Sequence, residues 1–175
     1  KDYQKADLII GNNVFAHVPD INDFSGGIKT LLSPNGSVTL EFPQFKNLLE
    51  HSQFDTIYHE HYSYLSLTSA SNIFSSNGLR IYDVEELETH GGSLRIYGCH
   101  QEASIPSSLN VQRLLDIENE IGFKTISTYE GFQERVEAIK YSLLDFLINA
   151  HKDGLIVDAY GAAAKGNTLL NFSGV

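Results

Sequence analysis

The sequence predicts an α/β fold, because two strand-like runs flank a helical pattern and a sharp turn. Residues 6–12 form an apolar run typical of a buried strand, and residues 21–32 have apolar side chains at helical spacing. Residues 33–36, Ser-Pro-Asn-Gly, are typical of a turn. Residues 37–42 predict a second strand, which Pro43 ends. Strand, helix, turn and strand in this order are typical of a parallel α/β sheet.

The middle of the chain predicts a helix and then two paired strands. Residues 68–77 have a helical pattern, with Thr68 as the expected cap. Residues 79–87 and 93–100 are strand-like, and the short connection through residues 91–92, Gly-Gly, favours an antiparallel pair at one end of the sheet.

The pattern changes near Gln101, where residues 104–107, Ser-Ile-Pro-Ser, predict a linker. Helical spacing of apolar residues follows over 107–121 and 128–151. Residues 155–160 predict another buried strand.

The composition bounds the class of protein. Of 175 residues 42% are hydrophobic, with ten Phe and nine Tyr, which is enough for a packed core. The formal charge of -10 excludes an overall basic nucleic-acid footprint, and no apolar run approaches the roughly 20 residues of a membrane helix. Cys99 is the only cysteine, so a reducing, cytoplasmic setting is expected. The lack of Met and the strand-like start predict that both ends are cut from a longer protein.

The run Tyr58-His59-Glu60-His61 concentrates four hydrogen-bonding side chains, which are costly to bury without partners. Histidine titrates near neutrality and is the usual general base. Three interpretations compete: a His-x-His metal pair with His17, His90 or Glu60 as a third ligand, a solvated polar loop, and a catalytic site.

Position in the fold favours the catalytic interpretation. Open α/β sheets bind ligands at the carboxyl ends of their strands. Asn12 and Asn13 stand at one such end, and His17 follows directly, whereas the His-rich stretch follows the second strand. We therefore expect His17 and the run at 58–61 to face one pocket, although His17 could also be a surface residue at a helix start.

Two glycine-containing segments are further candidates. Residues 90–95, His-Gly-Gly-Ser-Leu-Arg, allow close backbone approach and supply Ser93 and Arg95 as donors, or they form a simple turn between strands. Residues 161–168, Gly-Ala-Ala-Ala-Lys-Gly-Asn-Thr, could cradle phosphate on backbone N–H groups beside Lys165, or serve only tight strand–helix packing.

Four motifs, in order, resemble the sugar C-methyltransferases, which methylate C-3 of dTDP-linked 4-keto deoxysugars. They are residues 13–19 (Asn-Val-Phe-Ala-His-Val-Pro), 54–61 (Phe-Asp-Thr-Ile-Tyr-His-Glu-His), 90–95, and 160–168. The resemblance covers essentially the whole chain. It implies the second half of a class I (Rossmann-like) methyltransferase sheet over residues 1–103, followed over 104–175 by the start of a C-terminal α/β domain that holds the sugar nucleotide.

The resemblance also implies cofactors and a substrate. S-adenosylmethionine is the expected methyl donor, although the glycine-rich loop that holds its methionine end is missing from this sequence. Zinc is expected only in an N-terminal domain that this sequence lacks, and the residues of this chain are expected to bind no metal. The expected partner is a dTDP- or other NDP-linked keto-sugar.

Residue roles follow position by position from the resemblance. His61 matches the family's general base, and His17 a second active-site histidine. Tyr58 and Glu60 match residues that line the sugar site, and Asn12 and Asn13 lie where the chain passes the cofactor. The remaining residues expected to bind the sugar nucleotide are His59, Arg95, Lys165, Asn167 and Thr168. The alternatives to a methyltransferase are a non-catalytic sugar-nucleotide-binding module and a metal-dependent hydrolase that uses the histidines.

Overall fold

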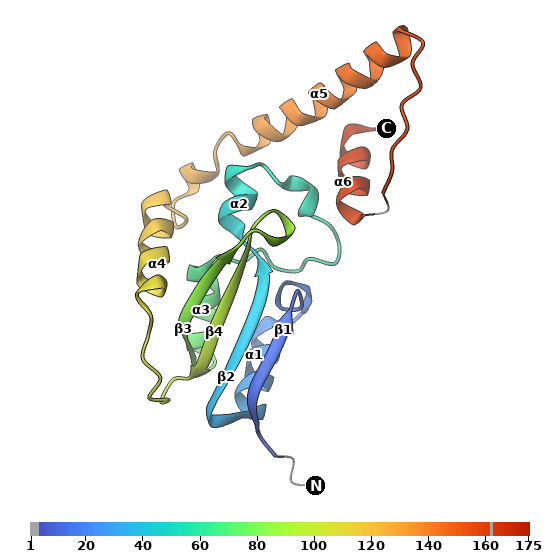
Figure 1. The fold of residues 1–175 in the computed structure, drawn as a ribbon. Coiled ribbons are helices and arrows are strands. Elements are labelled where there is room, and N and C mark those ends of the chain that lie inside the picture. The colour runs from blue at the N-terminus through green and yellow to red at the C-terminus, as the bar shows by residue number, and fades with distance from the viewer. Residues whose placement is uncertain (1–3, 162) are drawn as a thin grey trace. The chain divides into compact units, whose positions relative to one another are not determined.

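A computed structural model describes residues 4–161 and 163–175 (Figure 1). The chain forms two compact units, residues 1–46 with 61–124 and residues 47–60 with 125–175. The strands and helices of the first unit are β1 (Ala6–Asn12), η1 (Phe15–His17), α1 (Ile21–Leu31), β2 (Leu32–Pro43), α3 (Leu67–Ser76), β3 (Leu79–Leu87), η3 (Thr89–Gly91), β4 (Ser93–His100) and α4 (Leu109–Ile121). The others are α2 (Phe45–Glu50), η2 (Phe54–Thr56), η4 (Ile126–Tyr129), α5 (Phe132–Lys152) and α6 (Ala164–Ser173).

The first unit is an α/β structure with a mixed four-stranded sheet of order β1-β2-β4-β3. β1 pairs with β2 in parallel, and β4 pairs antiparallel with both β2 and β3. The predicted strand–helix–strand unit and the predicted antiparallel pair are therefore both confirmed. The segment predicted as a turn at residues 33–36 is a bulge inside β2, because β2 advances from Leu32 to Ser37 while β1 advances only from Ala6 to Leu8.

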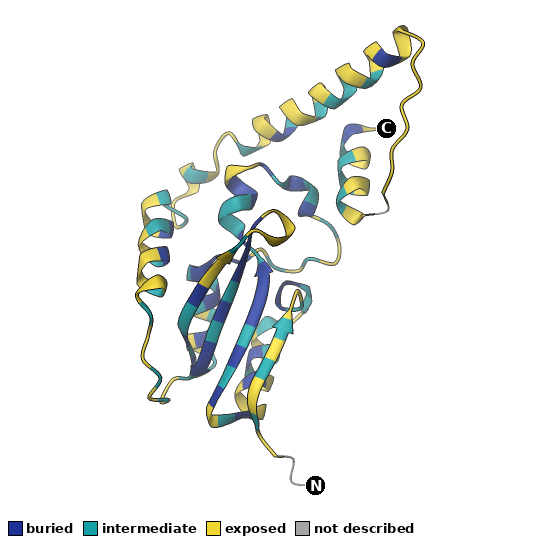
Figure 2. Cartoon of the chain, in the orientation of Figure 1, coloured by how far each residue is buried: buried dark blue, intermediate teal, exposed yellow. Residues whose placement is uncertain are grey.

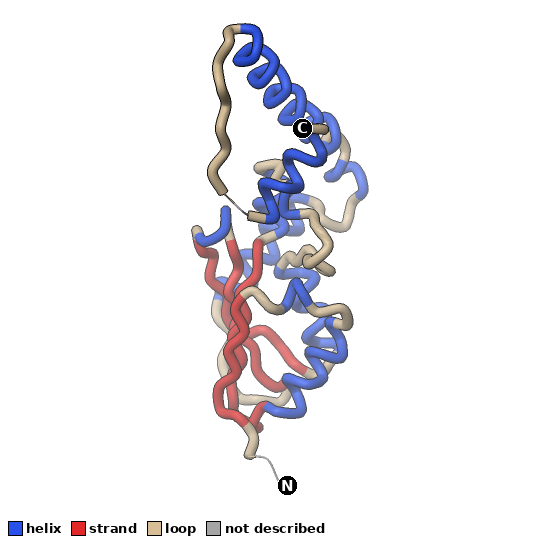
Figure 3. Tube along the Cα trace, turned by 90° about the vertical axis from the view of Figure 1, so that its right-hand side faces the viewer, coloured by secondary structure: helices blue, strands red, loops and turns tan. Residues whose placement is uncertain are grey.

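The hydrophobic core lies on one face of this sheet. Side chains from β2, β4 and β3 pack there against α1, α3 and α4, and Figure 3 shows helices along one side of the strands. The largest fully buried side chains include Phe15, Phe42 and Phe74. Gly98 of β4 permits this packing, since a Cβ at that position would collide with the Phe74 ring.

Two predictions of burial are wrong. β1 is a strand, but Leu8 and Ile10 are 57% and 64% exposed, because β1 lies at the edge of the sheet. Figure 2 shows exposed and half-buried residues along β1. Residues 155–160 form no strand and are exposed throughout, since no strand of the described chain pairs with them. An apolar run forms a buried strand only where another strand takes its backbone hydrogen bonds.

The cap of α3 also differs from the prediction. Ser66, not Thr68, is the N-cap, and its side chain forms a capping box with Ser69. Ser66 has the extended backbone that a cap requires, whereas Thr68 already lies inside the helix.

The second unit contains α5, η2 and α6. The Arg135 side chain donates to the Ser52 hydroxyl at 3.2 Å and to the Leu49 carbonyl at 3.1 Å, and the rings of Phe54 and Phe172 lie 5.0 Å apart. In the described part of the chain no helix combines the length and the apolar character that crossing a membrane requires.

Candidate functional site

The carboxyl end of β1 turns sharply into the short helix that carries His17. Asn12 and Asn13 are exposed there, and Asn13 has a φ of 53°, in the left-handed region that Asn tolerates better than most residues. The Asn13 N–H donates to the Glu41 carbonyl at 2.8 Å. Phe15 is fully buried and fixes the start of η1. His17, at the end of η1, is consequently half-buried near the carboxyl end of β1.

The loop before α3 places His61 against His17. The N–H groups of Tyr62 and Ser63 both donate to the Ala16 carbonyl, at 2.9 and 3.2 Å. The ring centroids of His17 and His61 are consequently 4.7 Å apart, edge to face with an interplanar angle of 69°. Two half-buried histidines, 44 residues apart in the chain, thus meet at the carboxyl end of the parallel strands.

Tyr64 lies beside His61 at this site, and the sequence did not identify it as a site residue. Its ring centroid lies 6.3 Å from that of His61, in an edge-to-face arrangement. The only signal in the sequence is a tyrosine three residues after His61 in an aromatic stretch.

The other members of the run belong to the second unit. Within it the Tyr58 and His59 ring centroids lie 6.4 Å apart, and His59 Nε2 is 3.9 Å from a Glu60 carboxylate oxygen. The side chains of His59 and Glu60 are 88% and 60% exposed. Burial, and secondarily the carboxylates of Glu60 and Asp55, raise the pKa of Tyr58, so its phenol keeps its proton at neutral pH.

Arg95, which is expected to bind substrate, forms hydrogen bonds with two carboxylates on the sheet. It donates to Glu41 at 2.8 Å and to Glu85 at 3.4 Å. Glu41 lies near the carboxyl end of β2, is only 5% exposed, and also accepts the Thr89 hydroxyl at 3.0 Å. The hydrogen bond from Arg95 is the main reason why the pKa of Glu41 lies below its ordinary value, against the opposing effect of burial. Substrate binding by Arg95 stays a prediction, and the buried Glu41 is a residue that no sequence pattern singled out.

Replacing Arg95 by Gln is expected to make the protein more sensitive to acid. A lowered folded-state pKa means that Glu41 stabilises the fold above its ordinary pKa, about 4.5, and that this stabilisation is lost as the pH falls through the lowered value. Without Arg95 the pKa of Glu41 rises, so the acid unfolding midpoint should move to higher pH and stability at pH 7 should fall by about 1–3 kcal/mol. Urea unfolding as a function of pH measures both. Arg113→Gln is the matched control, because Arg113 is 54% exposed in its pair with Glu86, and an equal shift in that variant would contradict the assignment.

The segment at residues 90–95 spans the end of the connection between β3 and β4 and the start of β4. His90 has a φ of 55°, and Gly91 and Gly92 have φ values of 84° and 111°, so the glycines are needed for the left-handed backbone of this turn. The Ser93 hydroxyl donates to the Thr89 carbonyl at 3.0 Å, which closes the connection.

The segment at residues 161–168 leads into α6, although Ala162 lies outside the described residues. The helix α6 begins at Ala164. Lys165 and Thr168 are half-buried, Asn167 is exposed, and the Thr168 hydroxyl donates to the Ala164 carbonyl at 3.1 Å. Phosphate binding by this segment stays a prediction.

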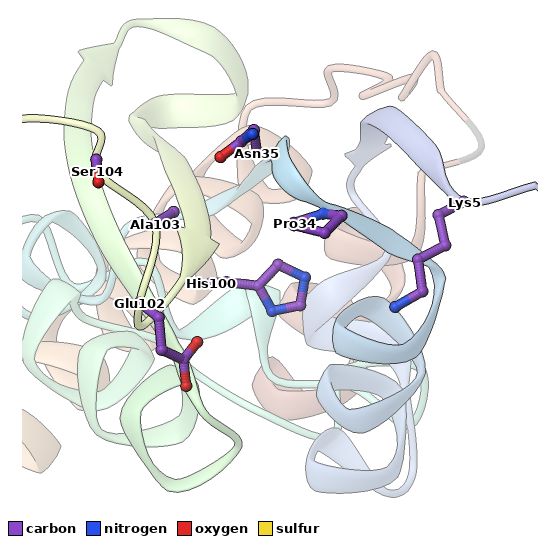
Figure 4. A pocket seen from close by; sticks show the side chains of 7 residues that line it. All are labelled: Lys5, Pro34, Asn35, His100, Glu102, Ala103 and Ser104. Carbon is purple, nitrogen blue, oxygen red and sulfur yellow. The ribbon is translucent and has the colours of Figure 1, made fainter.

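Among the described residues no group of three His, Cys, Asp or Glu side chains is arranged to hold a metal ion. An open cavity of about 320 Å³ lies at the opposite end of the sheet, near the start of β2 and the end of β4 (Figure 4). It contains none of the predicted site residues. Its lining consists of Lys5, Pro34, Asn35, His100, Glu102, Ala103 and Ser104.

Comparison with known proteins gives two family matches that together span nearly the whole chain. A family model described as a methyltransferase domain matches residues 1–84, and one described as a C-methyltransferase C-terminal domain matches residues 88–175. The C-methyltransferase NovU of Streptomyces niveus is 37% identical over 170 residues, which are 97% of this chain and 40% of NovU. The chain therefore spans about two fifths of the length of that relative.

Solved structures of methyltransferases are more distant. Magnesium protoporphyrin IX methyltransferase from Synechocystis PCC 6803 with bound SAH is 15% identical, with a TM-score of 0.43 over 57% of this chain and 47% of that one. The LepI complex with SAM is 12% identical, with a TM-score of 0.47 over 58% of this chain and 28% of that one. These scores are low, and the family assignment rests on the sequence matches alone.

Proposed function

Because this chain belongs to the C-methyltransferase family, we propose that it is part of an S-adenosylmethionine-dependent enzyme that methylates carbon on a nucleotide-linked keto-sugar. The methylated atom is the carbon next to the ketone of a 4-keto deoxysugar. The observation that carries the proposal is the His17–His61 pair, 4.7 Å between ring centroids, at the carboxyl end of the parallel strands. Open α/β sheets bind their ligands at this carboxyl end of the strands.

The chemistry needs a base, and His61 supplies it. The C–H group next to a ketone is weakly acidic. An imidazole held within reach of this proton is a suitable general base to remove it. The electron pair of the C–H bond then moves toward the ketone oxygen and forms an enolate. The enolate carbon would form the new bond to the methyl group as the bond from that methyl to the sulfonium sulfur breaks, which would leave a neutral thioether. The proton stays on the imidazole of His61 until it passes to solvent.

The developing enolate oxygen needs a hydrogen-bond donor. Tyr58 suits this role because its raised pKa keeps the phenol protonated, and His17 is the second candidate since its ring contacts His61. Glu60 would orient the sugar or His61. No metal ion is required for this step.

Asn12 and Asn13 would contact the cofactor, because both are polar and exposed where β1 ends. S-adenosylmethionine, when bound, supplies an electrophilic methyl group. The sugar nucleotide would be held by His59, Arg95, Lys165, Asn167 and Thr168, the last three next to its phosphates. The proposal includes a cytoplasmic location, domains at residues 1–103 and 104–175, and zinc only in an N-terminal domain outside this sequence.

The test is carried out on the intact enzyme with a dTDP-linked 4-keto deoxysugar in deuterium oxide. Without S-adenosylmethionine, the proton next to the ketone should exchange with solvent, as mass spectrometry would show. With S-adenosylmethionine, a product heavier by one methyl group should form on that carbon. Binding of the sugar nucleotide with neither exchange nor methylation would replace the proposal with a non-catalytic binding module.

A further inference from the structure

A carboxylate on α4 completes the hydrogen bonding of the first turn of α3. The Glu118 side chain is fully buried, and its two oxygens accept the N–H groups of Leu67 and Thr68, each at 2.7 Å. These two N–H groups belong to the set that the start of any helix leaves without an intrahelical acceptor. A carboxylate there also interacts favourably with the positive end of the helix dipole.

The remaining groups of this turn are satisfied within α3 itself. The Ser66 N–H donates to the Ser69 hydroxyl at 2.9 Å, and the Ser69 N–H donates to the Ser66 hydroxyl at 3.2 Å. The Ala70 N–H reaches the Ser66 carbonyl at 3.0 Å. Glu118 therefore accepts hydrogen bonds from the two N–H groups that the capping box does not satisfy, those of Leu67 and Thr68. Every N–H group of this turn consequently has an acceptor.

The turn that Glu118 binds is the end of the loop that carries His61. Leu65 forms an isolated bridge with Gln44 and accepts the Phe45 N–H at 3.0 Å, while Tyr62 and Ser63 donate to Ala16. Backbone hydrogen bonds thus anchor Tyr62, Ser63, Leu65, Leu67 and Thr68. This short anchored segment connects the first turn of α3 to the His17–His61 contact.

We propose that Glu118 is a positioning residue, which fixes the first turn of α3 and through it holds His61 against His17. The inference rests on the proposed function for its effect on catalysis, but not for its effect on geometry. Glu118 lies in the part of the chain that matches the C-methyltransferase C-terminal domain, whereas His17 and His61 lie in the part that matches the methyltransferase domain. The C-terminal part would therefore control the geometry of the catalytic loop without touching the substrate.

The test compares Glu118→Gln with Glu120→Gln in the intact enzyme labelled at histidine. Gln keeps the size of the side chain but presents an NH₂ group to one of the two N–H donors, so that donor loses its acceptor. The nuclear Overhauser contact between the His17 and His61 rings should weaken in Glu118→Gln and persist in Glu120→Gln, because Glu120 is exposed on the same helix. The kcat of Glu118→Gln should fall by about 10- to 100-fold. The part of its pH–rate profile that reports the protonation of the general base should shift along the pH axis.

Four outcomes are distinguishable. Loss of the ring contact together with the shifted pH profile, in Glu118→Gln only, supports the inference. An unchanged ring contact and an unchanged pH profile overturn it. Loss of the ring contact with undiminished proton exchange and methylation supports the positioning role and instead overturns the assignment of His61 as the base. If Glu118→Gln does not fold, Glu118→Asp keeps the charge with one methylene less reach, and an undisturbed ring contact in that variant also overturns the inference.

Discussion

Replacing His61 by Gln in the intact enzyme is expected to lower the kcat of methylation by about 10²- to 10⁴-fold, the usual contribution of a positioned general base. Exchange of the sugar proton next to the ketone with solvent should fall by the same factor, since both reactions need the same proton removed. Sugar-nucleotide binding should change little, because Gln keeps a hydrogen-bonding group of similar size. Steady-state kinetics and deuterium incorporation measure the two effects, and calorimetry measures the binding.

His51→Gln is the matched control for this substitution. His51 is exposed just after α2 and is not among the predicted site residues. Its replacement should leave kcat and exchange unaltered. Undiminished proton exchange in His61→Gln would remove His61 from the role of base, and His17, whose ring lies 4.7 Å away, would become the residue to replace next.

Replacing Phe15 by Ala is expected to destabilise the fold by about 3–5 kcal/mol, the range for large aromatic truncations in a core. Phe15 is fully buried, and its ring centroid lies 6.0 Å from Phe24, 5.8 Å from Phe42 and 6.0 Å from Phe74. Removal of the ring leaves a cavity among three other rings, and it also removes the contact that fixes the helix ending in His17. Urea unfolding at neutral pH measures the change in the free energy of unfolding.

Phe146→Ala provides the comparison for Phe15→Ala. Phe146 is 59% exposed on α5, so its truncation removes little buried surface and should change stability by less than about 0.5 kcal/mol. A loss below about 1 kcal/mol in Phe15→Ala would mean that the ring cluster is not the centre of the core.

The pattern of residues alone was sufficient for most helices and strands of the first unit. The four strands, the parallel pairing of β1 with β2 and the antiparallel pairing of β3 with β4 follow from apolar runs, turn residues and short connections. These signals are local, since the side chains that produce them lie within a few residues of one another. The motif at residues 54–61 and the family resemblance likewise required only the order of residues along the chain.

Three features that depend on distant partners or on backbone conformation were predicted wrongly. The burial of β1 depends on what covers each face of the sheet, and a strand at residues 155–160 depends on another strand to pair with. Ser66 and Thr68 have similar capping side chains, and only the backbone conformation at Ser66 decides between them. Each of these errors comes from a partner or a conformation that neighbouring residues do not specify.

The candidate site shows the same division. The residue types at His17 and His61 were enough to suggest proton transfer, because imidazole titrates near neutrality. Only the tertiary structure gives the 4.7 Å between their rings, the burial of Glu41 beside Arg95, and the two hydrogen bonds of Glu118 to a helix about fifty residues away. The sequence by itself determined which chemical groups the chain carries, whereas their distances and burial depend on contacts between segments far apart in the chain.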